Sequence, residues 1–129
     1  MGKRVLIVDD DTLLTKFFEF EAARNATTQF GVISADDGLE AIAFIERERP
    51  DLMILDIRLP KADGFAVLDH IQRKNYRFPV LVLTNYDKDE YREQCRQYDI
   101  VHEYLLKRSM VPRELVSMIE RYLEKSVAV

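Results

Sequence analysis

The sequence predicts an α/β domain in which an open parallel sheet of five strands is covered by helices on both faces. Short apolar runs recur along the chain with little alternation, which is typical of strands buried on both faces. Segments with apolar residues at helical spacing separate these runs, and all four prolines fall at boundaries between expected elements. Such alternation of strands and helices favours parallel strands joined by crossover helices.

The five expected strands are short and apolar. In chain order they are the runs 5–8, 30–33, 52–55, 80–83 and 104–106, the last being the least regular. None of them is long enough to cross a bilayer, and no apolar signal segment opens the chain. The runs therefore favour a sheet inside one globular domain.

The helices are expected between and after these strands, and the last one is the clearest amphipathic helix. Their expected apolar faces, helix by helix, are Leu14, Phe17, Phe18 and Ala22; Leu39, Ile42 and Ile45; Phe65, Leu68 and Ile71; and Leu115, Ile119, Tyr122 and Leu123. Asp37 with Glu40, and Asp87 with Glu90, match an acidic N-cap followed by glutamate at the third helical position. These pairs predict where the second and fourth helices begin.

Length, charge and composition exclude several classes of function. A chain of 129 residues with 47% hydrophobic and 33% charged residues suits one globular domain. A net charge of −4, with no run of Lys and Arg free of acids, disfavours a direct nucleic-acid partner. The single cysteine, Cys95, cannot form an internal disulfide, so we expect a cytoplasmic protein without a membrane partner. The four glycines form no phosphate-binding motif.

Polar side chains follow four of the five expected strands. Parallel strands end at one edge of the sheet, and ligands bind at that edge. Clustered carboxylates suit a hard cation such as Mg²⁺, whereas a hydroxyl and an ammonium can hold phosphoryl oxygens. A carboxylate can also act as a nucleophile, and Asp56 is the best candidate because it stands alone between a strand and a turn-forming loop at 59–64. The full set is Asp9, Asp10, Asp11, Asp56, Thr84 and Lys107.

The run of acids at 9–11 itself indicates a bound cation. Two carboxylates about 4 Å apart repel by roughly 4 kcal/mol at an effective dielectric constant of ~20. We expect one of the acids to have a raised pKa when Mg²⁺ is absent. Asp11 directly precedes the first expected helix, so an N-cap role fits it better than a role as a metal ligand.

Five motifs in this order resemble the receiver domains of bacterial two-component response regulators. They are VLIVDDD, LMILDIRLPKADGF, VLVLT, YLLK and the final helix, so the resemblance covers almost the whole chain. It implies a three-layer flavodoxin-like fold with strand order 2-1-3-4-5, a receiver domain over 1–126 and a short tail at 127–129. It also implies a phosphorylation-activated switch that receives its phosphoryl group from the phosphohistidine of a sensor histidine kinase or a histidine phosphotransfer protein. Such a domain catalyses only its own phosphorylation and dephosphorylation.

The resemblance implies a metal site and a phosphoryl acceptor. Asp56 matches the acceptor, and it also matches one of the Mg²⁺ ligands. Asp10 matches a direct ligand of the metal, and Asp9 matches a ligand that acts partly through water. The backbone carbonyl of Arg58 matches the remaining protein ligand.

The resemblance also implies a set of switch residues. Thr84 matches the switch hydroxyl, and Lys107 matches the ammonium that contacts a phosphoryl oxygen. Tyr104 matches the aromatic residue that turns inward once Thr84 moves toward the phosphate. Three further positions on the rim of the site are expected to tune access of water and the lifetime of the phosphorylated state: Arg58, Asn85 and Tyr86.

The chain departs from the receiver pattern at Arg108. Most receivers place a proline there, joined to the lysine by a cis bond. A cis bond before a non-proline residue costs about 2.5–4 kcal/mol, so we expect a trans Lys107–Arg108 bond and a reshaped loop up to Pro112. Output is expected through the surface of the fourth helix, fifth strand and fifth helix, where a downstream protein or a second copy would dock.

Two other functions remain open from the sequence. One is a degenerate receiver that acts as an interaction module without phosphorylation, which Arg108 and Asn85 keep open. The other is a phosphohydrolase resembling the haloacid dehalogenase group, which also uses strand-end Asp, Thr and Lys with Mg²⁺. The Asp-x-Asp-x-Thr/Val motif of that group is broken here, because Leu13 stands two residues after Asp11.

Overall fold

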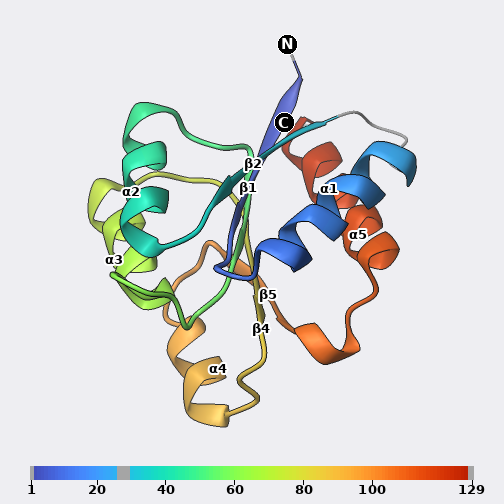
Figure 1. Cartoon of the computed structure of the whole chain (residues 1–129). Coiled ribbons are helices and arrows are strands. Elements are labelled where there is room, and N and C mark those ends of the chain that lie inside the picture. Colours follow the sequence, from blue (N-terminus) through green and yellow to red (C-terminus); the bar gives the residue numbers. More distant parts are fainter. Residues whose placement is uncertain (1, 26–29, 128–129) are drawn as a thin grey trace.

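A computed structural model describes residues 2–25 and 30–127, within which five strands and five α-helices alternate (Figure 1). All strand pairs are parallel and the order is β2-β1-β3-β4-β5, which confirms the predicted fold class. The strands are β1 (Lys3–Val8), β2 (Phe30–Ala35), β3 (Leu52–Leu55), β4 (Val80–Thr84) and β5 (Val101–Leu106). The helices are α1 (Thr12–Asn25), α2 (Gly38–Arg47), α3 (Gly64–Lys74), α4 (Asp89–Cys95), the 3₁₀ turn η1 (Lys107–Ser109) and α5 (Pro112–Val127).

The helices form two layers around the sheet. Figure 1 shows α1 and α5 on one face, and α2, α3 and α4 on the other. Every residue of β3 and β4 is buried, as expected of central strands covered on both sides. None of the helices within 2–25 and 30–127 combines the length and apolar character that a membrane span needs.

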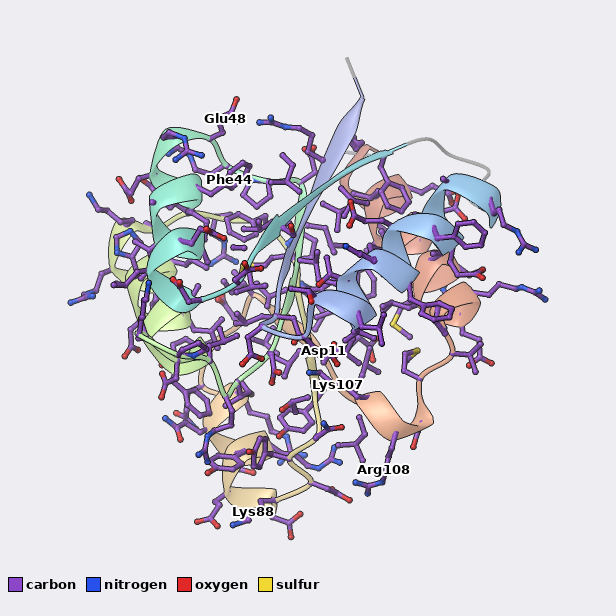
Figure 2. The ribbon with its side chains drawn as sticks, viewed as in Figure 1. Asp11, Phe44, Glu48, Lys88, Lys107 and Arg108 are labelled. Carbon is purple, nitrogen blue, oxygen red and sulfur yellow. The ribbon has the colours of Figure 1, made fainter. Side chains whose placement is uncertain are left out.

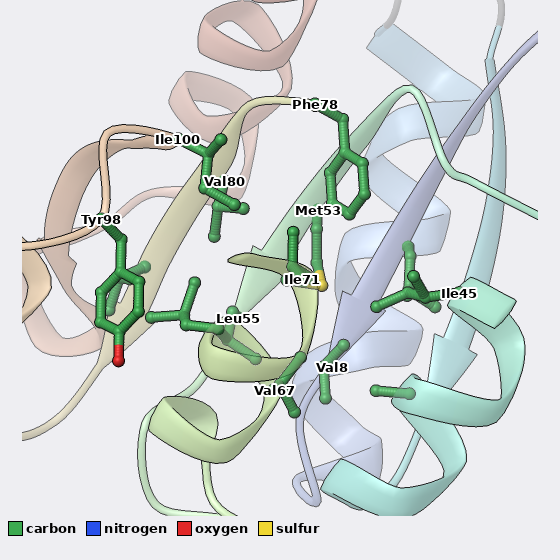
Figure 3. Close-up of a cluster of buried hydrophobic side chains, with 14 of the residues drawn as sticks. Val8, Ile45, Met53, Leu55, Val67, Ile71, Phe78, Val80, Tyr98 and Ile100 are labelled. Atoms are coloured by element: carbon green, nitrogen blue, oxygen red, sulfur yellow. The ribbon is translucent and has the colours of Figure 1, made fainter. Parts of the chain in front are cut away.

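Two buried clusters fill the space between the sheet and its helices. Alternate residues of each strand point to opposite faces, so Leu6 and Val8 join one cluster while Val5 and Ile7 join the other. Figure 3 shows the first cluster, where strand side chains meet those of α2, α3 and the segment before β5. Its labelled members are Val8, Ile45, Met53, Leu55, Val67, Ile71, Phe78, Val80, Tyr98 and Ile100. The second cluster joins α1 and α5 to the other face.

The register of the central strands brings two aspartates to the same level. Val8 of β1 pairs with Leu55 of β3, and the ladder continues because the Asp56 N–H donates to the Val8 carbonyl at 3.0 Å. The Asp9 N–H likewise donates to the Ala35 carbonyl of β2 at 3.1 Å. Asp9 and Asp56 therefore lie side by side, each directly after the end of its strand, β1 or β3.

In two helices, one residue predicted for the buried face is exposed. Phe17 is 57% exposed and Leu39 is 55% exposed, although both were expected to face the core. In α1 the adjacent Phe18 is buried, and Phe17, about 100° further around the helix, lies on the solvent side. In α2 the buried residues are Gly38, Ala41, Phe44 and Ile45, so the helix is rotated by about one residue from the expected face.

The structure confirms two N-caps and contradicts a third. The Asp37 carboxylate accepts the Glu40 N–H at 2.8 Å, and Asp11 accepts the Leu14 N–H at 3.1 Å, as the sequence predicts. The expectation that Asp87 caps the fourth helix is wrong. Lys88 precedes α4 and makes no side-chain cap. The Asp87 carboxylate is held instead by two arginines.

The end of the chain differs from expectation in its boundaries. β5 begins at Val101, three residues before the expected start, because Val101 and Glu103 also pair with β4, across an irregularity in the register. The Lys107–Arg108 bond is trans as predicted, and η1 forms the reshaped segment that follows β5. α5 continues to Val127, one residue into the expected tail, and 128–129 lie outside the described residues.

A close backbone approach holds the loop after β3 against α2. The Gly38 N–H donates to the Pro60 carbonyl at 3.4 Å, and a Cβ added at Gly38 would lie only 1.9 Å from the Ala62 carbonyl oxygen. Gly64 has a similar role, since a Cβ there would lie 2.6 Å from the Asp56 carbonyl oxygen. Only glycine lets the loop that follows Asp56 lie this close to its neighbours.

Gly38→Ala should therefore lower the free energy of unfolding by about 1–3 kcal/mol, because the new methyl group forces backbone atoms apart. Urea denaturation monitored by circular dichroism measures the change. Gly31→Ala is the matched control, since its Cβ would meet nothing closer than 3.9 Å. Equal stability of the two variants would contradict the close approach.

Candidate functional site

Three carboxylates gather at the edge of the sheet where the strands end. Oxygen atoms of Asp9, Asp10 and Asp56 all lie within 4.8 Å of one another. Asp9 and Asp56 are 2% and 6% exposed because their backbones continue the central ladder, whereas Asp10 is exposed. The sequence predicted this grouping, and the structure brings the three residues together.

The Lys107 ammonium joins the two buried carboxylates. Its Nζ lies 2.8 Å from Asp9 Oδ2 and 2.8 Å from Asp56 Oδ2. The other oxygen of each acid accepts a backbone N–H, from Asp11 to Asp9 at 2.9 Å and from Arg58 to Asp56 at 3.3 Å. Figure 2 shows Lys107 beside Asp11, at the end of β5 where the chain turns into η1. The sequence places Lys107 at the same edge of the sheet as Asp9, but it does not predict this direct contact between them.

Burial and charge shift two pKa values in the site. Burial raises the pKa of the Asp9 carboxyl, although hydrogen bonds from Lys107 and from the Asp11 N–H partly oppose that rise. This direction agrees with the expectation that one acid has a raised pKa without metal. Burial would lower the pKa of Lys107, but hydrogen bonds to Asp56 and Asp9 outweigh it and the pKa is raised. Lys107 therefore stays charged at neutral pH.

The donor set fits a divalent cation. Carboxylate oxygens are hard ligands of the kind that Mg²⁺ prefers. Three carboxylates against the single ammonium of Lys107 leave a charge of −2 when all are ionised, which one divalent cation balances. Asp11 does not belong to the group, because its carboxylate caps α1.

The switch candidates Thr84 and Tyr104 lie on the paired strands β4 and β5. Thr84 ends β4 with no exposed surface, and its Oγ1 accepts the Tyr86 N–H at 3.4 Å. Tyr104 of β5 is half-buried and donates its hydroxyl to the Tyr86 carbonyl at 2.5 Å. Burial raises the pKa of Tyr104 to about 12, so this hydroxyl keeps its proton. Both candidates thus converge on the backbone of Tyr86.

An open pocket of about 520 Å³ covers the site. Its rim carries Arg58, whose guanidinium lies 4.9 Å from the centre of the Tyr86 ring. Asn85 is exposed on the same rim. The lining residues are Asp10, Asp11, Asp56, Arg58, Leu59, Pro60, Asn85, Tyr86 and Lys107. The stacking of Arg58 on Tyr86 was not predicted, because nothing in the sequence links two residues on different loops.

The chain is similar in sequence to known regulatory proteins. Residues 5–120 match the family described as the response regulator receiver domain. The alkaline phosphatase synthesis transcriptional regulatory protein PhoP of Bacillus subtilis is 32% identical over 98% of this chain and 50% of its own length. The regulatory protein VanRc of Enterococcus gallinarum is 41% identical over 69% of this chain and 37% of its own. The chain thus spans half or less of these relatives.

Solved structures show the same similarity. A CheY-like response regulator receiver domain protein from Methanospirillum hungatei JF-1 superposes with a TM-score of 0.85 and 26% identity, covering 97% of this chain and 96% of its own. The receiver domain of AraT, a response regulator from Geobacillus stearothermophilus, superposes with a TM-score of 0.81 and 26% identity, covering 99% of this chain and 98% of its own.

The raised pKa of Asp9 predicts how the metal-free site responds to pH. The folded chain binds this proton more tightly than the unfolded chain. The contribution of Asp9 to stability is therefore fully present below the ordinary aspartate pKa and is lost as pH rises through the raised pKa. The ¹³Cγ shift of Asp9, assigned with the Asp9→Asn variant, should titrate above the ordinary aspartate range. A midpoint at or below that range would contradict the dominance of burial.

Proposed function

The chain belongs to the response regulator receiver domain family, and on this premise we propose that it is a signalling switch that accepts a phosphoryl group on Asp56. Domains of this family are signalling switches rather than metabolic enzymes. The observation that carries the proposal is the placement of Asp56 among two other carboxylates and the Lys107 ammonium, at the mouth of an open pocket. That grouping offers a nucleophile together with charge to stabilise a phosphoryl group.

The proposed metal is Mg²⁺. Asp10 would bind it directly, Asp9 partly through water, and Asp56 and the backbone carbonyl of Arg58 would complete the protein ligands. When bound, the cation neutralises charge on the phosphoryl oxygens and on the carboxylates. The cluster of three carboxylate donors supports this assignment.

The transfer itself is an in-line displacement at phosphorus. An Asp56 oxygen forms the new P–O bond while the P–N bond of a phosphohistidine breaks, and the electron pair leaves on the imidazole nitrogen. Lys107 already contacts Asp56 Oδ2, so its ammonium is placed to hold a phosphoryl oxygen once that carboxylate reacts. The Thr84 hydroxyl would contact a second phosphoryl oxygen. Catalysis then rests on positioning and charge rather than on proton abstraction.

The proposed switch couples Thr84 to Tyr104. Both contact the backbone of Tyr86, so a movement of the Thr84 hydroxyl toward the phosphoryl group would change the carbonyl to which Tyr104 donates. Arg58, Asn85 and Tyr86 on the rim would control access of water to the acyl phosphate, and with it the lifetime of the phosphorylated state. Their position around the pocket supports this role.

The proposed partners follow from the family. A sensor histidine kinase or a histidine phosphotransfer protein would supply the phosphoryl group in the cytoplasm. A downstream protein or a second copy of the chain would read the state of the switch on the surface of α4, β5 and α5. Direct contacts with nucleic acid or membrane are not part of the proposal.

Acetyl phosphate with Mg²⁺ should add one phosphoryl group to the purified protein, and Asp56→Asn should abolish that addition. Intact-mass spectrometry counts the added group. Asp11→Asn is the control, because it alters an acid next to the site that caps a helix instead of joining the carboxylate group.

Two other outcomes, one of this experiment and one of a phosphatase assay on the same variants, would support the rival functions. A wild-type protein that remains unmodified would favour an interaction module that works without phosphorylation. Turnover of a phosphate monoester that is lost in Asp9→Asn but kept in Asp56→Asn would favour a phosphohydrolase of the haloacid dehalogenase kind.

Lys107→Gln should slow phosphoryl uptake by about 100-fold, since one preorganised charged donor is lost from the reacting group. Stopped-flow quenching of fluorescence from a fluorophore attached near the site, or timed mass spectra, gives the rate. Lys61→Gln is the control, because that ammonium lies 3.6 Å from Asp37 and outside the site. A rate within two-fold of the wild type for Lys107→Gln would argue against the assigned role. A two-fold change corresponds to only about 0.4 kcal/mol of activation free energy.

A further inference from the structure

The loop between β4 and α4 contains an aspartate that is held by an arginine on each of its oxygens. Arg92 Nη2 of α4 donates to Asp87 Oδ1 at 2.8 Å, and Arg108 Nη2 of η1 donates to Asp87 Oδ2 at 2.8 Å. In Figure 2, Arg108 points away from Asp11 and toward the side of the molecule where Lys88 and α4 lie. Arg108 stands where the receiver pattern has proline. Three segments therefore meet at one carboxylate.

Arg92 makes a second contact that closes a circuit. Its guanidinium lies 4.7 Å from the centre of the Tyr104 ring, and the Tyr104 hydroxyl donates to the Tyr86 carbonyl. Tyr86 is the chain neighbour of Asp87, so the contacts run from Asp87 through Arg92 and Tyr104 back to the same loop. These contacts place the Tyr104 ring against Arg92 and its hydroxyl against the β4–α4 loop, an orientation called inward.

The position of this circuit relates it to the site. Thr84 lies three residues before Asp87 in the same connection, and Lys107 directly precedes Arg108. We propose that Asp87 and Arg108 form a positioning bridge, which locks the β4–α4 loop to the segment carrying Lys107 and favours the inward Tyr104 before phosphorylation. The effect of the bridge on phosphoryl uptake rests on the proposed function, whereas its effect on Tyr104 does not.

The electrostatics of the bridge match this role. Hydrogen bonds from Arg92 and Arg108 hold the pKa of the Asp87 carboxyl below its ordinary value, so the carboxylate stays ionised around neutral pH. The bridge lies at the surface, where each ion pair is weak and is screened by salt. Its loss should therefore change conformer populations by a few-fold without unfolding the protein.

Nuclear magnetic resonance of the metal-free protein with ¹³C-labelled tyrosine rings tests the bridge directly. Arg108→Gln and Asp87→Asn should each move the Tyr104 ring signals toward an outward conformer and speed amide exchange at 85–88 by about two- to five-fold. The double variant should match Asp87→Asn alone, because Arg108 has no ion pair left to lose once the Asp87 charge is gone. Asp87→Asn also removes the pair with Arg92, so its effect should be at least as large as that of Arg108→Gln. Arg108→Lys keeps the positive charge, so its Tyr104 signals should lie between those of the wild type and of Arg108→Gln. High salt should shift the Tyr104 signals of the wild type toward the outward conformer, as the variants do.

The rate of phosphoryl uptake from acetyl phosphate gives a second readout, with an expected loss of about two- to five-fold in Arg108→Gln. Arg77→Gln is the matched control, because Arg77 pairs with Asp99 at an exposed place outside the site. Tyr104 signals unchanged in both single variants, or additive effects in the double variant, would overturn the bridge. A wild-type protein that takes up no phosphoryl group would overturn the proposed function instead, while the Tyr104 signals still decide on the bridge.

Discussion

The ammonium of Lys107 between two buried carboxylates is the interaction on which the site depends. Taking Asp9 and Asp56 out of water is costly, and two acids on neighbouring strands also repel each other. A single ammonium at 2.8 Å from both offsets part of the desolvation cost and of the repulsion at once. Because Lys107 directly follows β5, the charge balance requires β1, β3, β4 and β5 to be assembled in register.

Much of the fold could be predicted from the sequence, because the apolar pattern of most segments matches the way they are buried in the structure. The central strands are apolar throughout, and their parallel order follows from the alternating helices. The wrong predictions occur where the local sequence allows two alternative placements of a side chain. Phe17 and Phe18 are both apolar, and only packing against α5 and the sheet decides that Phe18 is buried. Asp87 resembles an N-cap, but two arginines from other segments compete successfully for its carboxylate.

Only part of the candidate site could be predicted from the sequence: the residues at the strand ends, but not the contacts between the loops. The strand-end residues Asp9, Asp10, Asp56 and Lys107 meet as expected, because parallel strands place their carboxyl ends at one edge. Contacts between side chains of separate loops were not predictable. The stacking of Arg58 on Tyr86 depends on how two turns lie in space, and no periodic pattern records such a distance.

The three acids of the site lie at different depths, and this has a consequence for how a cation arrives. Asp10 is exposed, whereas Asp9 and Asp56 lie below the surface. An ion coming from solvent meets Asp10 first while it still carries its full shell of water. It would reach the oxygens of the two deeper acids only after it had shed part of that shell. Binding of a divalent cation would therefore be stepwise, with loss of water from the ion as the later step.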